Sequence, residues 1–73
     1  MARIELRSEV TGKVWKIEIP VGSVAGADEP VMIVESMKME IPVISEEGGT
    51  VTEILVAEGD SVEDGQVVAI LQS

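Results

Sequence analysis

Short runs rich in valine and isoleucine alternate with turn-forming residues along the whole chain. Apolar runs of this kind, bounded by glycine, proline and aspartate, are typical of β-strands, because β-branched side chains pack well on a pleated surface. No window free of glycine and proline has the apolar spacing of an amphipathic helix. The pattern predicts strands over residues 4–7, 13–19, 31–35, 39–44, 50–56 and 66–71.

The chain also repeats itself at an offset of 37 residues, which takes Gly12 to Gly49. Residues 10–36 and 47–73 share the pattern Gly-x-Val-x-x-Ile-x-[Ile/Val]-x-x-Gly. The three-residue step from valine to isoleucine breaks strict alternation, which predicts a bulge at the same place in both halves. Two copies of one motif predict an all-β flattened barrel or sandwich of two similar sheets related by a pseudo-two-fold axis. The terminal strands should then lie close together.

Between the two copies lies the segment 35–40, Glu-Ser-Met-Lys-Met-Glu. The strands on either side leave one or two residues for a turn, centred on Met37 and Lys38. Two-residue hairpin turns favour Asn-Gly, because φ is positive at their central positions. A Met-Lys pair is unfavourable there, and residues that break a local rule at a tip are candidates for function. We expect this hairpin at one end of the molecule and both termini at the other.

Composition removes several classes of function. The 73 residues include no cysteine and no histidine, so neither a thiolate or histidine-based active site nor a zinc-thiolate site is available. Fourteen acids against five bases give a net charge of −9, which argues against binding to nucleic acid or to an anionic membrane. The longest apolar run, 67–71, is far shorter than the ~20 residues of a spanning helix. We expect one small, monomeric, cytoplasmic domain.

The segment 34–40 resembles the biotinyl-lysine signature, typically Glu-Ala-Met-Lys-Met, of biotin carboxyl carrier proteins. The resemblance extends over residues 10–71 and includes both half-motifs and a Gly-Asp-x-Val-x-x-Gly turn at 59–65. It implies a barrel-sandwich hybrid of two four-stranded antiparallel sheets, with biotin attached to Lys38. It also implies that a biotin protein ligase or other partner contacts the residues around the lysine, which are Glu35, Met37, Met39 and Glu40.

A member of this family carries an intermediate and is not an enzyme. The resemblance implies that the ligase attaches biotin to Lys38, that a biotin carboxylase loads the cofactor, and that a carboxyltransferase passes the carboxyl group to an acyl-CoA or an oxo acid. An exposed lysine amine is protonated at neutral pH. Because the chain has no histidine, the base must come from the ligase.

The sequence departs from the family pattern in three places. Ser36 replaces the commoner alanine, a change from which little consequence is expected. The first-half loop at 23–30 has its valine and glycine displaced, so Asp28 or Gly26 should supply its turn. Neither a protruding thumb loop nor an Ala/Pro-rich linker is present, so we expect a free-standing carrier or an excised domain.

Other interpretations remain open. A lipoyl domain shares this fold but resembles Asp-Lys-Ala at its tip, whereas methionines flank Lys38 here; a carrier that accepts both cofactors stays possible. An unmodified structural hammerhead would lack the matched lysine.

Single residues also have alternative interpretations. The methionines could be core residues, Glu35 and Glu40 could be surface charges, and Trp15 is expected in the core or half-buried. The glycines are expected to form turns with positive φ, principally Gly12, Gly22, Gly49, Gly59 and Gly65. The acidic pairs at 46–47 and 63–64 should be solvated, with no metal.

Overall fold

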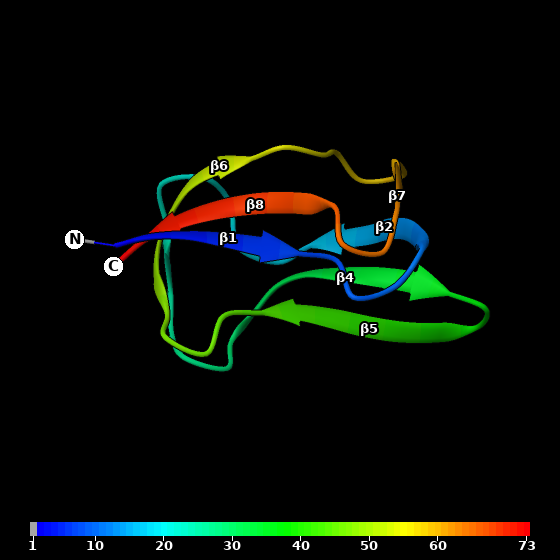
Figure 1. Cartoon of the computed structure of the whole chain (residues 1–73), viewed down its shortest axis with the longest axis horizontal. Helices are drawn as coiled ribbons and strands as arrows, with labels where there is room; N and C mark the ends of the chain where they lie inside the picture. The colour runs from blue at the N-terminus through cyan, green and yellow to red at the C-terminus, as the bar shows by residue number, and fades with distance from the viewer. Residues whose placement is uncertain (1) are drawn as a thin grey trace.

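The computed structural model describes residues 2–73, and it arranges them as two antiparallel sheets of four strands each (Figure 1). The strands are β1 (Arg3–Arg7), β2 (Gly12–Ile17), β3 (Val24–Ala25), β4 (Pro30–Ser36), β5 (Met39–Ile44), β6 (Gly49–Ile54), β7 (Ser61–Val62) and β8 (Val67–Gln72). One sheet has the order β1-β8-β6-β3 and the other has the order β5-β4-β2-β7. The predicted all-β fold of two four-stranded sheets is confirmed.

The two sheets are related by the sequence repeat. Adding 37 to the bounds of β2 gives those of β6, and the same offset takes β3 to β7. Applied to the whole chain, it converts the strand order of one sheet into that of the other. The repeat therefore extends to β1 and β5, which lie before each of the half-motifs recognised in the sequence.

The core fills the space between the sheets. Burial alternates along β1, whereas the interior strands β4 and β8 bury consecutive residues (31–32 and 68–71). Alternation along a strand sends successive side chains to opposite faces, so the inward positions are apolar. Met32 and Leu71 are the largest fully buried side chains. The other buried apolar residues include Leu6, Val14, Val31, Val34, Val43, Val51, Val62, Val68 and Ala69.

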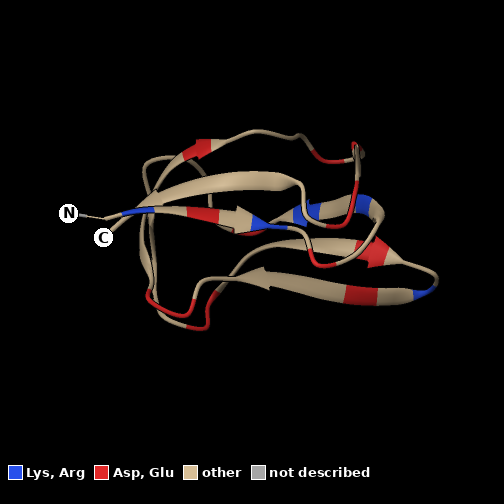
Figure 2. Ribbon diagram, viewed as in Figure 1, with Lys and Arg blue, Asp and Glu red and all other residues tan. Residues whose placement is uncertain are grey.

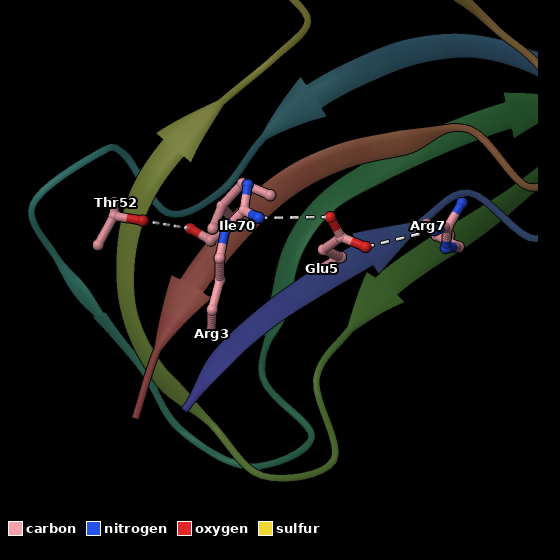
Figure 3. Close-up of polar contacts among 5 residues, drawn as sticks. All are labelled: Arg3, Glu5, Arg7, Thr52 and Ile70. Carbon is pink, nitrogen blue, oxygen red and sulfur yellow. Dashed lines mark hydrogen bonds and ion pairs between the residues drawn. The ribbon is translucent and has the colours of Figure 1, made fainter. Parts of the chain in front are cut away.

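The predicted bulges occur at equivalent places in the two sheets. The register of β2 against β4 shifts between Val14 and Lys16, and that of β6 against β8 shifts between Val51 and Glu53. The extra residues face outward but differ in kind. Trp15 is 51% exposed, so it lies on the surface of one sheet and outside the core. On the other sheet, the hydroxyl of Thr52 donates to the carbonyl of Ile70 at 3.1 Å (Figure 3).

Two strands end earlier than the sequence predicts. The predicted strand 13–19 ends at Ile17, because the Val31 carbonyl accepts hydrogen bonds from the N–H groups of both Glu18 and Ile19, which interrupts the ladder. The predicted strand 50–56 likewise ends at Ile54. The two-residue strands β3 and β7 were not among the predicted runs, since two residues carry no readable alternation.

Gly12 was predicted to form a turn with positive φ, and this prediction is wrong. It is the first residue of β2 and does not have positive φ, whereas Gly22, Gly49, Gly59 and Gly65 do. A Cβ at Gly12 would collide with the carbonyl oxygen of Glu35, so glycine permits close approach of β2 to β4. The loop at 23–30 turns at Asp28, whose φ is 64°. This was one of the two predicted alternatives, Asp28 or Gly26. Asp28 occupies the position equivalent to Gly65 in the second half.

The molecule measures 35 × 19 × 19 Å, with the β4–β5 hairpin at one end of the long axis and both termini at the other (Figure 1). The terminal strands β1 and β8 pair with each other, as predicted. The N–H of Ser73 donates to the carbonyl of Ala2 at 3.0 Å. Over residues 2–73, no helix is long and apolar enough to cross a membrane.

Candidate cofactor-attachment site

The hairpin that joins β4 to β5 has a two-residue turn. Ser36 pairs with Met39 at the end of the ladder, which leaves Met37 and Lys38 as the central residues. Their φ angles are 46° and 72°, the paired positive values of a type I′ turn. A side chain in this left-handed region costs roughly 1–2 kcal/mol per residue, because Cβ approaches the following carbonyl oxygen. The predicted tip is confirmed, together with its unfavourable Met-Lys pair.

The side chains at the tip project into solvent. Lys38 is exposed, Met37 is 93% exposed and Met39 is 61% exposed. The alternative that these methionines are core residues is therefore wrong. Large apolar side chains at such exposure offer adaptable surface to a protein partner, since the thioether chain is flexible and polarizable.

Glu35 and Glu40 lie directly opposite each other across the hairpin, one rung behind the turn. Figure 2 shows this arrangement as a basic segment at the hairpin tip with an acidic segment on each strand behind it. Lys13 of β2 pairs with Glu35 on its other side, so the row across the sheet is Glu40, Glu35 and Lys13. The ion pairs found among residues 2–73 involve Arg3, Arg7 and Lys16 and leave Lys38 without a partner carboxylate.

The base of the hairpin is tied to the neighbouring loops. The hydroxyl of Ser36 donates to the carbonyl of Thr11 at 2.9 Å. The hydroxyl oxygen of Thr11 accepts from the N–H of Asp64 at 3.1 Å. Gly12, next along the chain, gives the close approach that this contact needs. These contacts fix the base of the hairpin, while the side chains of Met37 and Lys38 remain exposed to solvent.

This anchor is not predictable from the sequence. Ser36 was expected to be a neutral replacement of alanine, because the partner of its hydroxyl lies 25 residues earlier in the chain. The sequence signal for the anchor is the hydroxyl of Ser36, one position before the turn. It can be interpreted only when β4, which ends at Ser36, is known to lie beside β2, which begins at Gly12.

The acidic residues at 46–47 and 63–64 are exposed. Within the described part of the chain, no group of three or more aspartate or glutamate side chains converges to hold a cation. The backbone N–H of Glu63 donates to the side-chain oxygen of Gln66 at 2.9 Å, which makes this segment a turn.

Comparison with known proteins agrees with this geometry. The family model described as "Biotin-requiring enzyme" matches residues 8–71. The chain belongs to the biotin/lipoyl attachment family. It is 37% identical to the biotin/lipoyl attachment protein of Bacillus subtilis over 65 residues, which is 89% of each chain.

Solved structures of the family have the same fold. The urea carboxylase of Kluyveromyces lactis superposes with a TM-score of 0.92 at 39% identity, covering 99% of this chain but 6% of that enzyme. The lipoyl domain of the 2-oxoglutarate dehydrogenase complex of Azotobacter vinelandii superposes with a TM-score of 0.74 at 25% identity, covering 100% of this chain and 98% of that domain. Biotin/lipoyl attachment domains are carrier domains.

Proposed function

We propose that this protein is a biotin carboxyl carrier, biotinylated on Lys38. The observation that carries the proposal is the tip itself: a single lysine in a strained two-residue turn, exposed at one end of a 35 Å molecule and flanked by exposed methionines. An amine placed there is open to an enzyme from several directions. Once deprotonated, the amine of Lys38 can act as a nucleophile and form an amide bond with the carboxyl group of the cofactor.

The residues around Lys38 support biotin over lipoate. Met37 and Met39 match the biotinyl signature, whereas the lipoyl signature has aspartate and alanine in these positions. Their exposure makes both side chains available to a ligase or a carboxylase. Glu35 and Glu40 supply a negative row directly behind the lysine, which we assign to recognition by the ligase.

The chain's own contribution is presentation. Ser36 and Thr11 hold the base of the hairpin, so the lysine is offered at a defined place. The chain has no histidine, so the ligase supplies the base that deprotonates the amine. Bound biotin supplies a ureido nitrogen that accepts and releases a carboxyl group, and a carrier need add only position and reach.

Tethering explains why such a carrier is useful. A group held on a flexible arm has a much higher effective concentration at each partner than the free cofactor. We assign the partners as a biotin protein ligase, a biotin carboxylase and a carboxyltransferase of a cytoplasmic system, with the carrier monomeric. The urea carboxylase that contains a matching domain supports this assignment.

The deciding experiment is the intact mass of the protein after incubation with a biotin protein ligase, ATP and biotin. We expect addition of one biotinyl group, with none on the variant Lys38→Arg. The variant Lys13→Arg, which changes another exposed lysine in the same way, should still be modified. Addition of a lipoyl group by a lipoate ligase, without addition of biotin, would assign the domain to lipoyl transfer. Addition of neither would indicate a structural domain.

A further inference from the structure

A surface cavity of about 350 Å³ lies beside β5, at the seam between the two sheets. β1 and β5 are edge strands of different sheets and contact each other along this seam. The volume falls at the lower end of the ~300–1,000 Å³ typical of small-molecule sites. Its walls are residues 41–44 of β5, together with Arg7, Glu9, Asp28 and Glu46.

The cavity is lined by residues that the repeat relates, but it is not symmetric. The offset of 37 residues takes Arg7 to Ile44 and Glu9 to Glu46, and all four line it. Residues 41–43 also line it, whereas the equivalent residues 4–6 of β1 are not among its walls. The cavity therefore opens along the strand that leads away from Lys38.

A cofactor arm on Lys38 is long enough to reach this cavity. At about 3.4 Å per residue, Pro42 lies roughly 13 Å and Ile44 roughly 20 Å from Lys38 along the strand. The extended arm of a biotinyl-lysine spans about 14 Å from Cα to the bicyclic ring, and the ureido oxygen lies a few ångströms beyond. An arm folded back along β5 would place its ring between these two positions.

The chemistry of the walls matches a ureido ring. Residues 41–44 make this side of the cavity apolar, which suits the sulfur-containing ring. The carboxylates of Glu9 and Glu46 are acceptors for the two ureido N–H groups.

Arg7 supplies the complementary donor. Its guanidinium donates to the Gly65 carbonyl at 2.8 Å and to Glu5 at 3.3 Å, and it has further N–H groups to offer a ureido oxygen (Figure 3 shows the Glu5 contact). The Gly65 contact also holds the guanidinium in place beside the cavity.

We propose that this cavity is a resting site for the uncarboxylated ureido ring on Lys38. The inference rests on the proposed function and deepens it. A dithiolane ring has no N–H group to give Glu9 and Glu46, so the site selects biotin over lipoate. A carboxylated ring is an anion, and the lining disfavours it because three carboxylates (Glu9, Asp28 and Glu46) outnumber the one guanidinium of Arg7. The cavity therefore holds the empty cofactor and releases the loaded one.

The test compares the biotinylated and unmodified proteins by ¹H–¹⁵N NMR, after intact mass has confirmed one biotinyl group. We expect amide shift changes in the biotinylated protein at residues 7, 9, 41, 43, 44 and 46, in addition to those at the tip. Shift changes confined to residues 36–40 in a fully biotinylated sample would overturn the resting site while leaving the proposed function intact. Absence of the biotinyl group would instead refute the proposed function.

A second readout uses variants of exposed residues that leave the core unchanged. The double variant Glu9→Ala/Glu46→Ala should lose the shift changes at the cavity and should be captured faster by streptavidin. The capture rate scales with the fraction of free rings, so a half-occupied resting site gives about a twofold increase. The matched control Glu53→Ala/Glu63→Ala removes the same charge elsewhere and should leave the rate unchanged. Equal capture rates for both double variants would overturn the proposal.

Discussion

At the hairpin tip, two side chains occupy left-handed backbone positions that asparagine and glycine usually fill. A lysine is required for attachment, so the turn cannot adopt the sequence that would stabilise it most. Strain of this kind persists where the surrounding structure holds the chain in place. Here the long β4–β5 ladder and the bond from Ser36 to Thr11 do so.

Replacement of Met37 by asparagine should therefore stabilise the fold and impair attachment. Asparagine tolerates the left-handed region, so the free energy of unfolding should rise by about 0.5–1 kcal/mol. Loss of the exposed thioether should lower the rate of biotinylation by the ligase. Urea unfolding and a timed mass assay measure the two effects.

Met39→Asn is the matched control, because Met39 is an exposed strand residue without positive φ. It should slow biotinylation without raising stability. A stability gain of equal size in both variants would contradict the role assigned to turn strain.

At the scale of the elements, the close approach of β2 to β4 sets the base of the tip. A methyl group at Gly12 would meet the Glu35 carbonyl, and the strands would have to separate. Gly12→Ala should lower the free energy of unfolding by about 1–3 kcal/mol, the usual cost of overpacking. Measurement of the urea midpoint tests this expectation.

Gly26→Ala provides the comparison for Gly12→Ala. A Cβ at Gly26 would lie 3.7 Å from its nearest neighbour, an oxygen of Glu29, and Gly26 has no positive φ. This variant should be close to neutral. If both substitutions cost the same, the close approach does not explain the glycine at position 12.

Some features of the elements were predictable and others were not. The bulges follow from a break in alternation between Val14 and Ile17, which is local information. The turn at Asp28 was predicted only as one of two alternatives, Asp28 or Gly26, and the positive φ of Asp28 decided between them. The two-residue strands β3 and β7 do not, because their assignment depends on pairing with β6 and β2.

At the scale of the whole molecule, the two termini take the place that a second hairpin would occupy. The offset of 37 residues relates the pair Ser36–Met39 at the tip to Ser73 and Ala2, which are joined by a backbone hydrogen bond. The ends of β8 and β1 can therefore be connected by a short turn without strain on either sheet.

A circular permutant should fold and accept biotin. We expect this of a chain in which Asn-Gly joins Ser73 to Ala2 and new termini open between Glu46 and Glu47, which are exposed turn residues. It should unfold cooperatively and be modified on Lys38 to the same extent as the parent, by circular dichroism and intact mass. A permutant opened between the buried residues Val68 and Ala69 should fail to fold. Folding of both would show that β8 need not be continuous.

The sequence by itself determined the six longer strands, the repeat and the position of the tip, because each depends on residues close together in the chain or on a match between its halves. The tertiary structure alone decided the anchor between Ser36 and Thr11, the role of Gly12 and the cavity beside β5. These features join side chains that are distant in sequence. Their contacts exist only after β2 has paired with β4 and the edges of the two sheets have met.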